Sequence, residues 1–106
     1  MVKEILTSAG FIENKTFKET RFITPPRSTY AVFMDSFTRR GADTKNLIKE
    51  HDDTIELYSY KPDPIAESNI EREFDKRNIE YDKADRLWIN EELLYQVVYT
   101  FSYTEK

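Results

Sequence analysis

The residue types best suited to chemistry lie together in one short stretch, KEHDD at positions 49–53. His51 is the only histidine of the chain, and neighbouring carboxylates could make it a general base or join it around a metal ion. Asp53 is the carboxylate that would share such a metal with His51. The alternative interpretation, which we favour, is a histidine at a strand edge in a polar patch.

The composition of the chain argues against most reactive sites. The chain has no cysteine, which excludes disulfides and thiolate metal sites, and one histidine cannot form the common zinc ligand sets. A Ser-His-Asp triad is compatible with the composition, but no nucleophile elbow or glycine-rich oxyanion loop is present. Gly10 and Gly41 are too few glycines for a phosphate-binding loop. We therefore expect no enzyme, no catalytic residue, no bound metal and no cofactor.

Further aspartates could hold a hard cation, namely Asp52-Asp53, Asp82 and Asp85. A calcium loop needs alternating oxygen ligands, a central glycine and a terminal glutamate, and no segment has that spacing. We therefore interpret these aspartates as solvated residues of turns.

Charge is distributed unevenly, although the net charge is only -4. Residues 38–49 carry four cations and one acid, whereas residues 63–82 carry seven acids and three cations. The basic patch consists of Arg39, Arg40, Lys45 and Lys49. Such a patch could contact nucleic-acid phosphates, but the chain as a whole is acidic and Phe37 is the nearest aromatic residue. A protein contact or plain solvation is the better interpretation.

A scaffold of strands must position these residues, and its clearest signal is near the C-terminus. From Leu93 to Tyr103, every second residue is aromatic or aliphatic, which places one row on a single strand face. This row is Tyr95, Val97, Tyr99, Phe101 and Tyr103. Tyrosine is enriched where proteins meet, but we expect most of these rings to cover a sheet face beneath helices.

Two helices and two hairpins are predicted. Apolar residues at i, i+3, i+4 and i+7 predict a short helix over residues 2–9, ended by Gly10. Asp63 as N-cap and Pro64 predict a second helix that ends near residues 77–78. Strands are expected at residues 29–38, 54–60, 87–89 and 93–103, with a turn over residues 39–43. A strand near Phe17 is uncertain.

The order α-β-β-α-β-β predicts an α+β fold: a mainly antiparallel sheet of about four to five strands with two helices packed on it. The 106 residues suit a single domain, residues 1–106, with one core. No apolar run is long enough to span a membrane and no signal-peptide core is present. We expect a soluble protein made inside the cell.

Two long segments carry a resemblance to a known family. They are GADTKNLIKEHDDTIELYSYKPDPIAESNIEREF at residues 41–74 and RNIEYDKADRLWINEELLYQVVYTFSYTEK at residues 77–106. Over about residues 25–106 the chain resembles small proteins of the tail completion or tail terminator group from tailed phages and prophages of Gram-positive bacteria. The similarity is one of overall pattern, and no functional residue of the family maps onto this chain.

The resemblance implies a structural role in virion assembly. Tail terminators are small α/β domains that form a ring, typically hexameric, at the head-proximal end of the tail tube, where they stop its growth and receive the head connector. The implied partners are the tail tube protein, the head connector or completion protein and further copies of the chain, with no nucleic-acid specificity and no membrane. The implied location is the host cytoplasm during assembly and then the tail or neck of the virion.

Two alternatives remain beside the tail terminator. One is another neck or minor tail protein, and the other is a small cytoplasmic module that binds and regulates a host protein. For the ring, which joins two different patches, we expect the basic hairpin tip of one subunit to meet the acidic helix of the next. The expected interface residues are Phe37, Arg39, Arg40, Lys45, Lys49, Glu67, Glu71 and Asp75.

Overall fold

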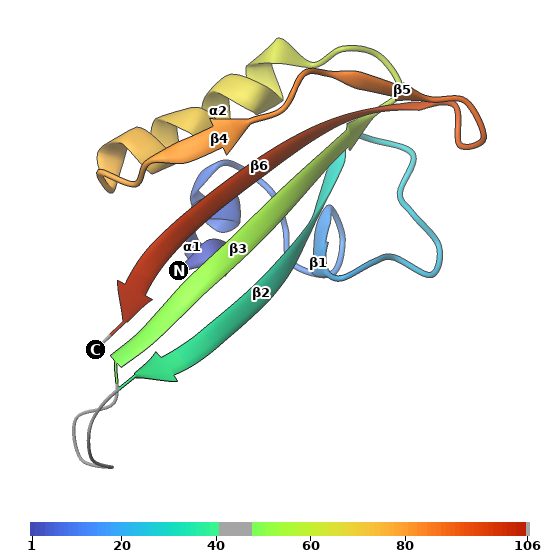
Figure 1. Cartoon of the computed structure of the whole chain (residues 1–106). Coiled ribbons are helices and arrows are strands. Elements are labelled where there is room, and N and C mark those ends of the chain that lie inside the picture. The colour runs from blue at the N-terminus through green and yellow to red at the C-terminus, as the bar shows by residue number, and fades with distance from the viewer. Residues whose placement is uncertain (41–47, 106) are drawn as a thin grey trace.

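A computed structural model describes residues 1–40 and 48–105, which form two helices and one six-stranded sheet (Figure 1). The elements are α1 (Val2–Ser8), β1 (Phe17–Glu19), β2 (Tyr30–Arg40), β3 (Ile48–Ser59), α2 (Pro64–Lys76), β4 (Tyr81–Lys83), β5 (Leu87–Ile89) and β6 (Leu94–Glu105). The predicted α+β class is confirmed. Neither helix of the described chain is long and apolar enough to cross a membrane.

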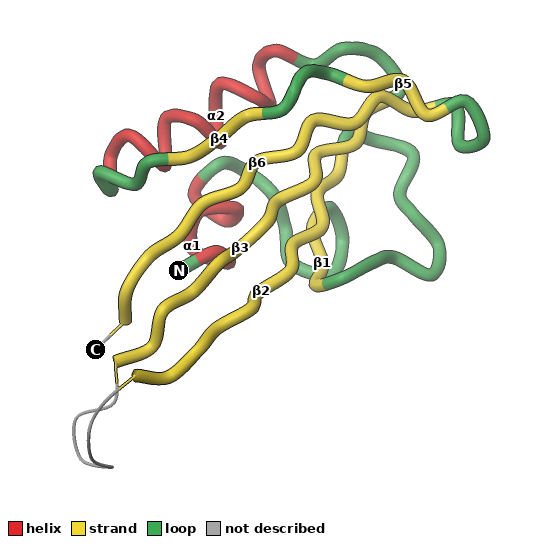
Figure 2. Tube along the Cα trace, in the orientation of Figure 1, coloured by secondary structure: helices red, strands yellow, loops and turns green. Residues whose placement is uncertain are grey.

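Three long antiparallel strands dominate the sheet, with β3 at the centre between β2 and β6 (Figure 2). The β2–β3 ladder runs from Tyr30 opposite Tyr58 to Arg40 opposite Ile48. The predicted turn at residues 39–43 therefore begins too early, since β2 continues through Arg40. Its remainder, with Gly41, lies outside the described residues, as does Lys45.

Two short strands account for the difference from the predicted element order. β1 pairs in parallel with β2, Phe17 lying opposite Ala31, and β4 pairs with β6 in the segment expected to be the exit from α2. Each contains three residues, too few to show a periodic pattern. Both strands form because a long neighbouring strand offers backbone partners. In β1, the fully buried side chain of Phe17 adds to this.

The helix ends form as the local sequence predicts. Gly10 follows α1 with a φ of 103°, which an L side chain rarely adopts. At the start of α2, Asp63 accepts a hydrogen bond from the backbone N–H of Ala66 at 3.0 Å. Its other carboxylate oxygen accepts one from the hydroxyl of Thr29 at 2.7 Å. This cap therefore fixes both the helix start and the chain entering β2.

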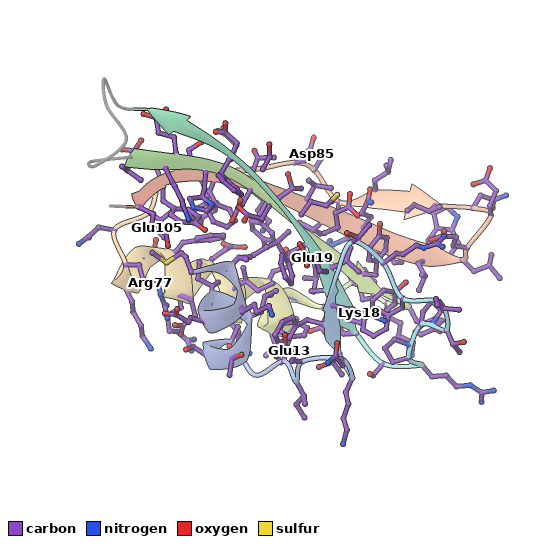
Figure 3. All side chains as sticks on the ribbon, turned by 90° about the horizontal axis from the view of Figure 1, so that it is seen from below. Glu13, Lys18, Glu19, Arg77, Asp85 and Glu105 are labelled. Carbon is purple, nitrogen blue, oxygen red and sulfur yellow. The ribbon has the colours of Figure 1, made fainter. Side chains whose placement is uncertain are left out.

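Both helices pack on the same side of the sheet, as Figure 3 shows. The sheet side of the core includes the predicted aromatic row of β6, in which Val97, Tyr99 and Phe101 are buried. Phe74 of α2 packs edge-on against this row, its ring centroid 4.8 Å from that of Phe101. The predicted cover by helices is confirmed for Val97, Tyr99 and Phe101 only, since Tyr95 packs against Trp88 and Tyr103 against His51.

The far ends of the long strands extend beyond the helices (Figure 1). We name residues 34–40, 48–53 and 102–105 the β arm. The molecule measures 49 × 28 × 23 Å and has a radius of gyration of 14.9 Å. A compact domain of this length would have a radius of gyration of about 13 Å. The arm makes the fold elongated and carries the residues that the sequence marks for chemistry.

Candidate functional site

A polar cluster lies where the helix-facing side of the sheet passes from the core into the β arm. In the core this side carries Phe33 of β2 opposite Ile55 of β3. The next positions on the same side, two residues along each strand, are Asp35 and Asp53, which are also directly opposite. His51 follows on β3. The strand period therefore places two carboxylates and the single histidine on one surface.

His51 lies between two carboxylates and against an aromatic ring. Its Nδ1 is 2.6 Å from Oδ1 of Asp35, and its Nε2 is 3.1 Å from Oε1 of Glu105. The ring of Tyr103 stacks on the imidazole at 4.4 Å with an interplanar angle of 4°. The bond with Asp35 raises the pKa of His51, against the opposing effect of burial. The imidazolium form satisfies both carboxylates with N–H donors.

Asp53 has the least favourable surroundings of the cluster. It is 1% exposed, and neither of its carboxylate oxygens accepts a hydrogen bond from a described residue. Burial raises the pKa of Asp53 to about 7, and the carboxyl group of Asp35, which can share a proton with it, acts in the same direction. The shared proton and the bond from His51 hold the pKa of Asp35 below its ordinary value.

These positions correct two interpretations of the sequence. His51 does not lie at a strand edge, because β3 is the central strand of the long ladder and the residue is only 7% exposed. Asp52 and Asp53 are not turn residues, because β3 begins at Ile48 and includes both. They point to opposite faces, so that Asp53 is buried while Asp52 is exposed and accepts a hydrogen bond from Ser102 at 2.6 Å.

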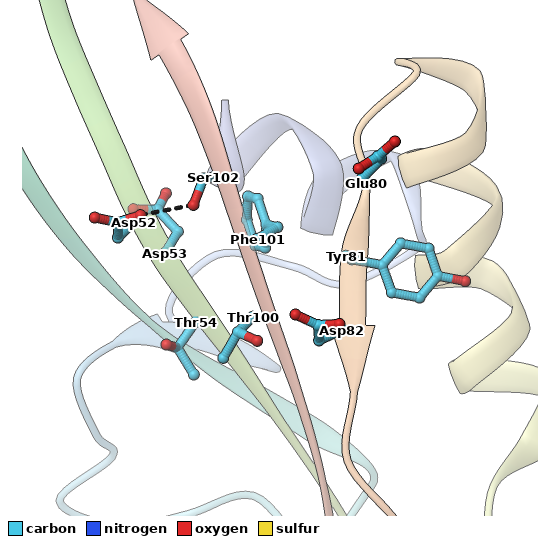
Figure 4. A pocket seen from close by; sticks show the side chains of 9 residues that line it. All are labelled: Asp52, Asp53, Thr54, Glu80, Tyr81, Asp82, Thr100, Phe101 and Ser102. Carbon is cyan, nitrogen blue, oxygen red and sulfur yellow. Dashed lines mark hydrogen bonds between the residues drawn. The ribbon is translucent and has the colours of Figure 1, made fainter.

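Two of the other predicted acids line a surface pocket of about 400 Å³ over β3, β6 and β4, which Asp53 also borders (Figure 4). Asp52 and Asp82 reach this pocket, and Asp85 is not among its lining residues. Asp82 lies in β4 and therefore not in a turn, whereas Asp85 lies between β4 and β5. Among the described residues, the group able to share one ion is Asp35, His51 and Asp53, whose ligand atoms lie within 4.8 Å of one another.

The acidic residues predicted for a subunit interface have partners inside the chain. Glu67 is 5% exposed and lies 2.8 Å from Nζ of Lys83 and 2.7 Å from Nη2 of Arg86. Glu71 is 2.8 Å from Lys83 and accepts a hydrogen bond from the hydroxyl of Tyr99 at 2.7 Å. Burial opposes the ionisation of Glu67, but the two cations outweigh it and lower its pKa.

Among the other residues predicted for the interface, Asp75 lies in α2, whereas Arg39, Arg40 and Lys49 lie in the β arm. Asp75 is exposed near the end of α2. The backbone of Arg39 and Arg40 lies at the far end of the β arm. Phe37 and Lys49 lie beside the polar cluster, with the Phe37 ring 5.4 Å from that of His51 and Nζ of Lys49 5.5 Å from the Phe37 ring.

Sequence reasoning did not identify Asp35 and Glu105 as members of the cluster. Asp35 is 16 residues from His51 in the chain, and Glu105 is 54 residues away. One available signal was an acid on a strand face otherwise formed by Ala31, Phe33 and Phe37. Glu105 gave no comparable signal, because its position depends on the register between β3 and β6.

No protein-family model matches the chain, and no curated protein matches it. The structure itself gives an α+β domain with a projecting β arm and a buried histidine–carboxylate cluster at its base.

Proposed function

We propose that this chain is a structural protein of virion assembly, a tail terminator or tail completion protein of a long-tailed phage or prophage. In this role it forms a ring at the head-proximal end of the tail tube and joins the tail to the head. The class of protein in this proposal comes from the resemblance of residues 25–106 to the tail completion or tail terminator group. The observation that carries the proposal is the β arm, which extends past the helices and offers backbone to a neighbour.

The β arm has two open edges in the described part of the chain. β1 pairs with β2 only as far as Phe33, and β4 pairs with β6 only as far as Phe101. Beyond those points, residues 34–40 and 102–105 have no described strand on their outer sides. Unpaired edges bind added strands through backbone hydrogen bonds. Two different edges permit a head-to-tail contact, from which closed rings are built.

A second contact surface lies at the opposite end of the sheet, around the turn between β5 and β6 (Figure 1). Leu87, Trp88 and Leu93 are 57%, 44% and 62% exposed there. Leu87 and Trp88 are successive residues of β5 and point to opposite faces, so this end of the sheet exposes apolar side chains on both sides. Such side chains are typical of protein interfaces. A protein that joins two assemblies needs two such surfaces, and the arm and this turn provide them at opposite ends.

The test is assembly with a tail tube protein, which the proposal expects to be encoded beside this chain. We expect the purified chain to cap polymerising tubes, so that electron micrographs show a ring at one end of each tube and shorter tubes as more chain is added. Binding to assembled tails or heads without control of tube length would indicate another neck or minor tail protein. Failure to bind any virion component would overturn the proposal and favour the regulatory module.

A further inference from the structure

The polar cluster at the base of the β arm has the composition and arrangement of a metal site. We propose that Asp35, His51 and Asp53 bind one divalent transition-metal cation, with Glu105 as a positioning residue. The candidate ligand atoms come from two adjacent strands and lie within 4.8 Å of one another. This site goes beyond the assembly role and does not depend on it.

The donor set selects the class of cation. One imidazole nitrogen and two carboxylates suit Zn²⁺, Mn²⁺ or Fe²⁺, whereas Mg²⁺ and Ca²⁺ prefer oxygen ligands alone. The absence of cysteine and of a second histidine excludes the common structural zinc sets, but not a site in which carboxylates supply the other ligands. Three protein ligands leave coordination positions for water.

The buried carboxylate of Asp53 is the observation that favours a cation site. A histidinium between Asp35 and Glu105 accounts for those three side chains without a metal. Asp53 remains buried to 99%, and neither of its oxygens meets a hydrogen-bond donor among the described residues unless the carboxyl pair with Asp35 takes up a proton. Buried polar groups without partners are rare in native proteins, and an ion is one of the few explanations for them. A cation bound by Asp35 and His51 would also bind Asp53.

Glu105 and Tyr103 hold the imidazole in the orientation that a metal ligand needs. Histidines that bind metals usually donate their other ring N–H to a carboxylate, which fixes the tautomer and the ring direction. Here Nε2 lies 3.1 Å from Glu105, and Nδ1 faces Asp35. The stacked ring of Tyr103 restricts rotation of the imidazole. Nδ1 is therefore the nitrogen assigned to the cation.

The cluster is open on one side and closed on the other. The side chains of Asp35 and Glu105 are 28% and 54% exposed, whereas Asp53 lies against the core. A cation can therefore enter beside Asp35 without opening the sheet. Because β2 and β3 are hydrogen-bonded in register through this region, the ligands are held by a rigid element and not by a loop.

The test uses full-length chain without a histidine tag, stripped with a chelator and titrated with ZnCl₂ by calorimetry. We expect one Zn²⁺ per chain. We expect binding about tenfold or more weaker in Asp53→Asn and His51→Gln, since each removes a proposed ligand, and also in Glu105→Gln, which removes the positioning carboxylate. Asp52→Asn is the matched control: the same change on the same strand, one residue away and on the opposite face. It should bind as the wild type does.

Nuclear magnetic resonance of the wild type keeps the test independent of how the variants fold. The single histidine gives one pair of imidazole ¹⁵N signals, and we expect Zn²⁺ to shift the Nδ1 signal and saturate at one equivalent. MnCl₂ should broaden the same signals, and MgCl₂ should leave them unchanged. Zinc that binds without moving the His51 signals, or that binds Asp53→Asn as tightly as the wild type, would overturn the proposal.

Discussion

At the scale of single residues, Asp53 couples stability to pH in the metal-free protein. Its pKa is about 7 in the folded chain, well above the ordinary value of an aspartate, because it is buried. From about pH 4 to about pH 7 the unfolded chain has lost this proton while the folded chain keeps it. The folded state therefore binds more protons than the unfolded state. The contribution of Asp53 to the free energy of unfolding falls as the pH rises through this window.

Replacement of the Asp53 carboxyl group tests whether it lowers stability as the pH rises. In chelator, we expect Asp53→Asn to be more stable than the wild type near pH 8 by about 1 to 3 kcal/mol, the cost of an unpartnered buried polar group. The difference should shrink toward pH 4, where the folded wild type keeps this proton and the unfolded chain begins to regain it. Urea unfolding across this range measures it, and Asp52→Asn serves as the control. A variant less stable than the wild type near pH 8 would contradict this account.

Glu67 gives the opposite pH dependence. Its pKa is lowered in the fold, so its ion pairs with Lys83 and Arg86 contribute stability above the ordinary glutamate value and lose it as the pH falls through the folded value. We expect Glu67→Gln to lose about 1 to 3 kcal/mol at neutral pH, since Arg86 loses this carboxylate partner and Lys83 keeps only Glu71. The loss should disappear in strong acid. Chemical unfolding measures it, with the exposed Glu91→Gln expected to change little.

The cluster around His51 could be predicted from the sequence only in part. The alternation in residues 31–37 places Asp35 on the apolar face of its strand, and the KEHDD stretch joins His51 to Asp53. An aspartate pair outside any hydrophobic run is typical of a turn, which is why β3 was expected to begin at Thr54. Only pairing with β2 and β6 makes that stretch a strand and brings in Glu105.

At the scale of elements, local signals predict the helices better than the short strands. The boundaries of α2 follow from Asp63, Pro64 and the cations of its last turn, all within the helix or next to it. β1 and β4 depend on residues far along the chain and have no pattern of their own. The helices with local causes could be predicted, whereas β1 was expected only as an uncertain strand near Phe17 and β4 was not expected at all.

The N-cap of α2 provides a test at this scale. We expect Asp63→Ala to lower the free energy of unfolding by about 1 to 2 kcal/mol, because the bonds from Ala66 and Thr29 are both lost. Asp75→Ala, the same change at the exposed C-terminal end of the helix, should cost nothing or stabilise slightly, since an acid there opposes the helix dipole. Thermal unfolding compares the two. Equal losses of stability in the two variants would mean that the hydrogen bonds of the Asp63 cap do not cause the loss.

At the scale of the whole molecule, the fold combines a covered core with two surfaces that have no covering element. The β arm ends in the basic segment of the β2–β3 hairpin, and the apolar turn between β5 and β6 lies at the opposite end. Glu67 and Glu71 are paired within the chain, so the acidic partner predicted for the arm is reduced to Asp75 and its neighbourhood. If subunits meet as proposed, we expect their contact to depend on charges at the arm more than on charges of α2.

Charge reversal at the arm separates assembly from folding. We expect Arg39→Glu combined with Arg40→Glu to leave thermal unfolding unchanged and to reduce strongly the fraction of tail tubes capped by rings in electron micrographs. Complementary charges set register and encounter rate more than affinity, so the wild type should also assemble more slowly in high salt. Lys15→Glu combined with Arg27→Glu, an equal change in charge away from the arm, should cap tubes normally. Because both pairs alter the net charge alike, unimpaired capping by the arm variant would mean that the neighbouring subunit does not recognise the arm through its charge.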